Sequence, residues 1–101
     1  MEDNEMVSFQ IISAVGTARS LYIEAIAKAK AGDFEAANNL VEQGKTTFLE
    51  GHKAHAGLVQ KEANGEKLEF SLLLMHAEDQ LMSAETLKIV AQELIDIYRN
   101  K

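Results

Sequence analysis

Apolar residues recur at steps of three and four along almost the whole chain, which is the spacing of one face of an α-helix. Between about residues 4 and 31 this stripe contains Val7, Ile11, Val15, Ala18, Tyr22, Ala25 and Ala29. From about 33 to 63 it contains Phe34, Ala37, Leu40, Val41, Phe48, Leu49, Leu58 and Val59. From about 70 to 99 it contains Leu72, Leu87, Val90, Leu94, Ile97 and Tyr98. The pattern predicts three helices of roughly thirty residues each.

Glycine-containing turns separate these stripes. Gly32 can adopt the left-handed conformation that ends a helix, and Asp33 can cap the next helix with its carboxylate. Gly65 gives a second stop, and Ser71 is a candidate cap for the third helix. Short connections favour antiparallel neighbours. We therefore predict an all-α fold, an antiparallel up-down-up three-helix bundle forming one domain over residues 1–101.

The composition agrees with a helical protein and excludes several functions. The chain has no proline and no cysteine, which rules out disulfides and thiolate metal sites. Its formal charge of −6 is scattered without a basic patch, so we do not expect nucleic acid as a partner. The acidic start does not resemble a signal peptide, and no apolar run is long enough to span a bilayer. We expect a cytoplasmic protein without direct membrane insertion.

The first half of the third predicted helix has more apolar surface than one bundle can bury. On a helical wheel Leu87 and Leu94 fall beside His76. The far side holds Leu74, Met75, Leu81 and Met82. A three-helix core covers only one of these faces. We therefore predict a homo-oligomer packed through this half of the helix, in which the pattern alone does not fix the number of copies.

A histidine, a carboxylate and an amide share one patch of this helix: His76, Asp79 and Gln80. A lone histidine on an apolar face is more often a hydrogen-bonded core or interface residue than a functional one. Asp79 favours function, because an acid in an apolar interface must be paired, protonated or bound to a cation, and no basic residue is near it in the sequence. Converging copies of Asp79 would call for a hard cation such as Mg²⁺. A nucleophilic imidazole can accept a phosphoryl group and pass it on.

Two other functions stay open at this point. His52 and His55 lie one turn apart and would suit a bundle metalloprotein, although no Glu-x-x-His pair accompanies them. Alternatively, the apolar half of the third helix docks a foreign helix, which would make the chain a non-enzymatic adaptor. No nucleophile elbow, P-loop or dinucleotide fingerprint is present.

The segment from His76 to Met82 closely resembles the motif His-x-x-Asp-His-Leu-Met. That motif belongs to the enzyme IIA component of the lactose/cellobiose (N,N′-diacetylchitobiose) branch of the bacterial sugar phosphotransferase system. Further matches, in the same order as in the family, are Gly16-Thr-Ala-Arg-Ser20, Ala31-Gly-Asp-Phe34 and His52. The chain departs from the family pattern at Gln80, where the family has a second histidine, at His55, where it has Gln, and at Gly51, where it has Ala.

The resemblance implies a homotrimer of three-helix subunits, nine helices in all. It implies that His76 takes a phosphoryl group on Nε2 from phosphorylated HPr and passes it to a cysteine of the cognate IIB component. IIB then phosphorylates a disaccharide of the lactose, cellobiose or chitobiose class during uptake through IIC. Asp79 is expected to bind a divalent cation, usually Mg²⁺, at the trimer axis.

The phosphoryl group brings nearly two negative charges, and the helix offers no arginine beside His76. Gln80 and Ser83, at i+4 and i+7 from His76, are the expected local hydrogen-bond donors to its oxygens. Arg19 is a candidate cation that would have to reach the site from the first helix.

Overall fold

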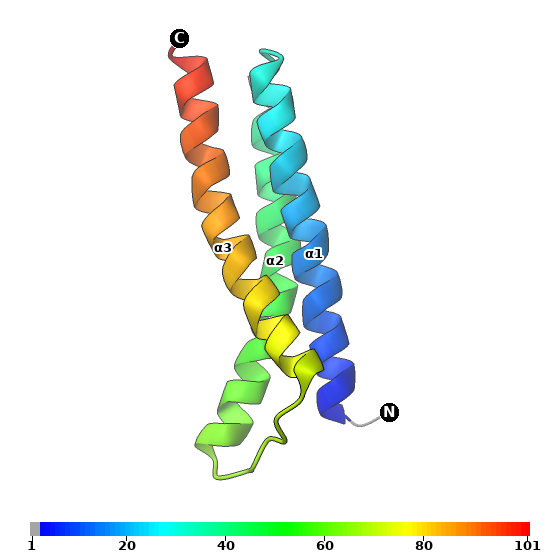
Figure 1. The fold of residues 1–101 in the computed structure, drawn as a ribbon. Coiled ribbons are helices and arrows are strands. Elements are labelled where there is room, and N and C mark those ends of the chain that lie inside the picture. Colours follow the sequence, from blue (N-terminus) through cyan, green and yellow to red (C-terminus); the bar gives the residue numbers. More distant parts are fainter. Residues whose placement is uncertain (1–2) are drawn as a thin grey trace.

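The computed structural model describes residues 3–101, which form three helices. They are α1 (Asp3–Lys30), α2 (Phe34–Ala63) and α3 (Leu72–Arg99). The helices run up, down and up, so the two ends of the chain lie at opposite ends of the bundle (Figure 1). The predicted all-α antiparallel bundle is confirmed for these residues. Met1 and Glu2 lie outside the described residues, and one domain over residues 1–101 stays a prediction.

The turns and caps form where the sequence predicts them. Gly32 and Gly65 have φ values of 86° and 91°, a region that glycine enters without a Cβ penalty. Asp33 accepts a hydrogen bond from the Ala36 backbone N–H at 3.1 Å. Ser71 likewise accepts from the Leu74 backbone N–H at 3.0 Å. These caps satisfy donors that the first turns of α2 and α3 would otherwise leave unpaired.

α1 is the central helix, since it packs along both α2 and α3, whereas α2 and α3 contact each other much less. Its fully buried apolar residues are Ile11, Val15, Ala18, Tyr22, Ala25 and Ala29. These belong to the stripe that the periodicity predicts for this helix. No helix within residues 3–101 combines the length and the apolarity needed to cross a bilayer.

Two glycines let α2 approach α1 closely. Gly44 and Gly51 are buried, and a Cβ added at Gly44 would collide with the ring of Tyr22. A Cβ at Gly51 would lie 2.8 Å from Cγ1 of Val15, which is also too close. In the polar middle of α2, the helix backbone therefore packs directly against side chains of α1. The sequence analysis missed this contact because glycine has no hydrophobic side chain to count.

The core face predicted for α3 is partly wrong. The residues that α3 buries are Ala77, Leu81, Ala84, Ala91 and Ile95. Leu72, Val90 and Ile97 are instead 80%, 43% and 56% exposed, while Leu87 and Tyr98 pack half-buried against the core. Close packing against α1 selects small side chains on α3. The prediction considered large hydrophobic residues and not alanine. The predicted core face is therefore rotated around the helix from the observed one.

Candidate functional site

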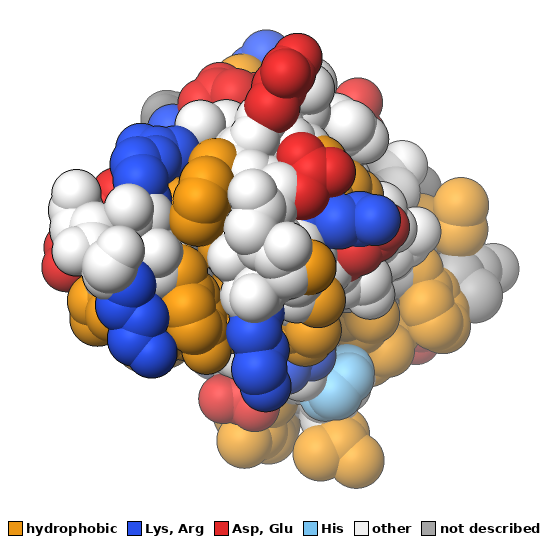
Figure 2. All heavy atoms as spheres, turned by 90° about the horizontal axis from the view of Figure 1, so that it is seen from above, with side chains coloured by type: hydrophobic (Ala, Val, Ile, Leu, Met, Phe, Trp, Pro, Cys, Tyr) orange, Lys and Arg blue, Asp and Glu red, His pale blue; other side chains and the backbone are white. Residues whose placement is uncertain are grey.

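The side of α3 turned away from the core carries large apolar side chains that the chain itself does not cover. We call it the outer face, and it consists of Leu72, Met75, Met82, Val90 and Ile97. At 100° per residue these positions lie roughly opposite the alanine-rich face of the same helix. Figure 2, a view along the bundle, shows hydrophobic side chains at the molecular surface among charged ones. Exposed apolar side chains gathered on one face, here interrupted by Asp79, Thr86 and Glu93, are typical of an interaction surface.

His76 lies at the edge of the outer face. Its side chain is exposed, and it makes no hydrogen bond within the part of the chain that the structure describes. The next residue, Ala77, is fully buried in the core, as is Leu81 one turn further on. The helix backbone under His76 is therefore held by packing, while the imidazole ring is open to an approaching molecule. An exposed imidazole on a backbone held in this way can act as a nucleophile.

Arg19 links α1 to the same turn of α3. Its Nη1 donates a hydrogen bond to Oε1 of Gln80 at 3.2 Å. Its Nε is buried and finds no partner among residues 3–101. The sequence predicts Arg19 only as a candidate cation that would have to reach the site from the first helix. The structure places its guanidinium one helical turn beyond His76, on the amide of Gln80.

Asp79 and Ser83 line a shallow hollow together with Arg19. Asp79 is exposed, and none of the ion pairs formed within residues 3–101 involves it. In this range no three His, Asp or Glu side chains come close enough together to hold a metal ion. At Asp79, one chain therefore offers a single carboxylate as a metal ligand. The predicted cation at Asp79 requires carboxylates from further copies and stays a prediction.

His52 and His55 do not share a site. His55 Nε2 lies 2.5 Å from Oε1 of Glu78, and this contact joins α2 to α3 two residues from His76. His52 is exposed and stacks against Phe48, with ring centroids 6.2 Å apart. The histidines that the metalloprotein hypothesis combines thus have different neighbours, and no observation favours that hypothesis.

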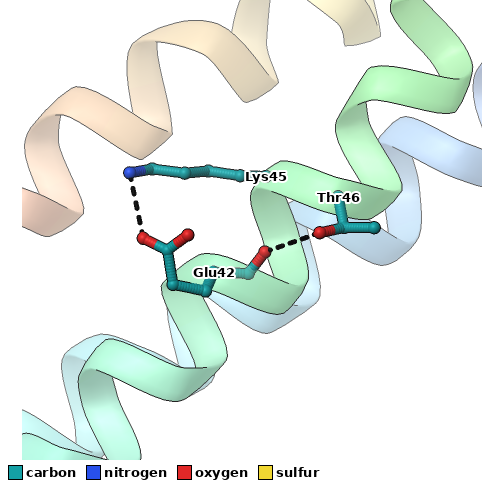
Figure 3. A network of polar contacts seen from close by, with 3 residues as sticks. All are labelled: Glu42, Lys45 and Thr46. Carbon is teal, nitrogen blue, oxygen red and sulfur yellow. Dashed lines mark hydrogen bonds and ion pairs between the residues drawn. The ribbon is translucent and has the colours of Figure 1, made fainter.

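Tyr22 is a buried polar group that the sequence analysis treated only as core. Its side chain is fully buried, and its hydroxyl has no hydrogen-bond partner among the described residues. Burial raises the pKa of Tyr22, and the nearby charge of Glu42 raises it further. Glu42 is itself held on α2, where Lys45 donates to its carboxylate at 3.2 Å and Thr46 to its carbonyl at 3.1 Å (Figure 3).

Comparison with known proteins identifies the family. Residues 6–99 match the family described as PTS system, lactose/cellobiose specific IIA subunit. The chain belongs to this family, so it is a component of a sugar phosphotransferase system. The resemblance inferred from the segment that contains His76 is confirmed at the level of the family.

The curated relatives cover nearly the whole chain. The lactose-specific EIIA component of a PTS system from Staphylococcus aureus (strain N315) is 37% identical over 97% of this chain and 95% of its own length. The lichenan-specific phosphotransferase enzyme IIA component from Bacillus subtilis (strain 168) is 43% identical over 96% of this chain and 88% of its own length. These relatives are named for different sugars.

Solved structures agree with this assignment. The PTS cellobiose-specific enzyme IIA from Bacillus anthracis superimposes with a TM-score of 0.97 at 42% identity, covering 99% of this chain and 92% of that one. The IIA(Chitobiose) in the IIA(Chitobiose)–HPr complex of the N,N′-diacetylchitobiose branch of the Escherichia coli phosphotransferase system superimposes with a TM-score of 0.84. It is 33% identical, with 99% of this chain and 97% of that chain covered.

Proposed function

We propose that this chain is a phosphoryl carrier in bacterial sugar uptake and that His76 carries the group. The observation that supports this most is an exposed imidazole on a helix whose neighbouring residue is locked in the core. A similar IIA protein has been solved with HPr, so phosphorylated HPr is the proposed donor. The proposed acceptor is a cysteine of a cognate IIB component, which phosphorylates a disaccharide carried by IIC. A relay between these partners places the chain in the cytoplasm.

Phosphoryl transfer requires mainly that the protein positions the reacting groups and stabilises the charge on the phosphoryl oxygens. The lone pair of Nε2 of neutral His76 forms a bond to phosphorus while the bond from phosphorus to the donor breaks, and the donor leaves with that electron pair. In the second step the thiolate of the IIB cysteine attacks phosphorus. The N–P bond then breaks, and its electron pair returns to the imidazole. Because each step exchanges one bond to phosphorus for another, His76 is regenerated.

The transferred group brings nearly two negative charges to the surface of an acidic protein. Gln80 lies one turn after His76 on the same side of α3, so it can donate a hydrogen bond to a phosphoryl oxygen, and Ser83, two turns after His76 on that side, is the second proposed donor. Both donors are neutral. The group is therefore held weakly enough to be passed on, as a relay requires.

The outer face supports a homotrimer as the working assembly, with nine helices in all. Copies of the chain would cover Met75 and Met82, which a single chain leaves exposed. The same packing would bring Asp79 carboxylates together at the symmetry axis. Asp79 fits a cation site there because it is exposed and unpaired within residues 3–101. Bound Mg²⁺ would neutralise the converging carboxylates and stabilise the assembly.

The test is phosphoryl transfer from purified phospho-HPr to the chain and to His76→Gln. We expect about one acid-labile phosphate per wild-type chain and none on the variant, because the amide is not a nucleophile toward phosphorus. His52→Gln removes an exposed histidine elsewhere on the bundle and is expected to label like the wild type. Labelling of His76→Gln at wild-type stoichiometry would refute the proposal. Light scattering on the same samples tests the trimer, and a monomer would favour an adaptor instead.

A further inference from the structure

We propose that Arg19 is a positioning residue for this reaction. It holds the side-chain amide of Gln80 so that the amide NH₂ group faces a phosphoryl group on His76. The inference rests on the proposed function of His76. It concerns a residue on a different helix and goes beyond the local donors expected from α3 alone.

The first step is the identity of the atoms in the contact. The guanidinium of Arg19 has only N–H donors, so the Gln80 atom that faces it at 3.2 Å must be the carbonyl oxygen. The reversed amide would set N–H against N–H and lose the hydrogen bond. The orientation of the amide therefore follows from chemistry rather than from a choice between two similar atoms. Its two N–H groups are left free for another acceptor.

The second step is the position of that acceptor. Gln80 follows His76 by four residues, so the two side chains are neighbours on the surface of α3. Arg19 approaches from α1, where it follows the fully buried Ala18, and it also lines the open hollow beside Ser83. With its oxygen bound to Arg19, the amide keeps its nitrogen free for an acceptor at the surface of α3. The exposed His76 ring lies one turn away on the same surface of the helix.

The third step is charge. Gln80 is neutral, and no Lys or Arg stands beside His76 on α3. A hydrogen bond from a guanidinium polarises the amide and makes its N–H groups stronger donors. Arg19 thus brings a positive charge next to the amide of Gln80. Because the side chain is already hydrogen-bonded before the group arrives, little reorganisation is needed when it does.

The experiment measures the equilibrium constant for phosphoryl transfer between HPr and four proteins: the wild type, Arg19→Met, Gln80→Met and the double variant. A hydrogen bond to a charged group is worth at least about a factor of ten in an equilibrium. We expect each single variant to shift the equilibrium about tenfold toward phospho-HPr. The double variant is expected to shift no further, because the two side chains act as one unit.

Two further variants separate positioning from a structural role. Arg99→Met removes the same charge about 28 Å further along the bundle and is expected to leave the equilibrium within about twofold of the wild type. In Gln80→Glu the new carboxylate can still accept from Arg19, now as an ion pair. The change removes both N–H donors and adds a negative charge. We expect thermal stability to be kept while phosphate occupancy falls more than tenfold. A purely structural contact would change stability and occupancy together.

Three results would overturn the inference. One is wild-type equilibrium in Arg19→Met, another is wild-type occupancy in Gln80→Glu, and the third is additive losses in the double variant. The Gln80→Glu result decides the matter if Arg19→Met does not fold. Failure of the proposed function is distinguishable, since the wild type itself would then carry no phosphate on His76.

Discussion

The two apolar faces of α3 are built from residues of different size and meet different surroundings. The face against α1 is mostly alanine, with Ala77, Ala84 and Ala91 all fully buried. The outer face carries larger side chains, among them Met75 and Met82, and they remain exposed. Small residues allow two helices to approach closely, whereas flexible methionines adapt to a partner surface. In this chain the size of an apolar residue separates the contacts within one chain from the exposed face that we propose contacts further copies.

Polar groups follow the same division. On the inner side Tyr22 buries a hydroxyl that finds no partner among residues 3–101, in a seam closed by the glycines of α2. On the outer side His76 and Asp79 are exposed to solvent in a single chain. The inner side is therefore closely packed, while the outer side of a single chain leaves reactive and charged groups accessible. Variants that exchange these properties test the contrast directly.

The largest expected effect comes from a charge on the outer face. Met82→Glu would bury a carboxylate in every subunit contact, at a cost of several kcal/mol per copy. We expect the assembly to fall to monomers that keep their helical content, because Met82 contributes little to the core of one chain. Light scattering gives the mass, and circular dichroism gives the fold.

Gln92→Glu is the matched control for that change. It adds the same charge to the same helix, on a side turned away from the outer face, and is expected to leave the mass unchanged. A wild-type mass for Met82→Glu would show that the outer face is not a contact between copies.

Adding a methyl group at Gly44 is expected to disrupt the close contact between α1 and α2. In Gly44→Ala the new Cβ meets the ring of Tyr22, and we expect a loss of about 1–3 kcal/mol in the free energy of unfolding. Gly57→Ala is the control on the same helix, where no atom lies within 4 Å of the added Cβ. Its better helix propensity should instead stabilise the protein by up to about 1 kcal/mol. Urea denaturation measures both, and equal effects would contradict a close α1–α2 contact at Gly44.

Local signals in the sequence predicted the fold well. The left-handed glycines at 32 and 65 and the caps at Asp33 and Ser71 were all predicted, because each depends on a few neighbouring residues. The rotation of α3 was not, since it is decided by how closely its alanines pack against another helix. The distance between the two helices cannot be predicted by counting large side chains.

The candidate site divides in the same way. His76 and Asp79 were predicted from spacing along one helix, and the structure finds both exposed on the same stretch of α3. The hydrogen bond from Arg19 to Gln80 joins residues 61 positions apart. Neither residue type predicts that contact alone, because it depends on the relative position of α1 and α3. Arg19 lies in a segment that matches the family and Gln80 departs from the family motif, and neither observation says that the two residues meet.

An intermediate effect is expected at the proposed symmetry axis. Asp79→Asn removes the converging charges, so the trimer should no longer need a divalent cation. We expect chelation with EDTA to lower the melting temperature of the wild type by several degrees and to leave Asp79→Asn unchanged. Asp96→Asn, at an exposed carboxylate near the end of α3, is the control and should respond like the wild type. Equal sensitivity of Asp79→Asn and the wild type to EDTA would place the cation elsewhere.

The smallest expected effect lies on the inner side, at Tyr22. Its hydroxyl is buried without a partner within residues 3–101, so Tyr22→Phe removes a desolvated group and should be neutral or stabilising by up to about 1 kcal/mol at pH 7. Because burial raises the pKa of Tyr22 in the folded state, its contribution to stability is fully present below the unfolded pKa of about 10. That contribution is lost as the pH rises toward and through the folded value.

Tyr22→Phe should therefore lose less stability than the wild type between about pH 9.5 and 11. Tyr98→Phe removes the other tyrosine hydroxyl, at a half-buried position near the end of α3. It keeps Tyr22 and therefore serves as the control. It is expected to show the full alkaline loss when urea midpoints are compared across this range. If Tyr22→Phe and the wild type lost stability in parallel, the Tyr22 hydroxyl would have to be solvated or paired. The inner seam would then be less tightly closed than the contact at Gly44 implies.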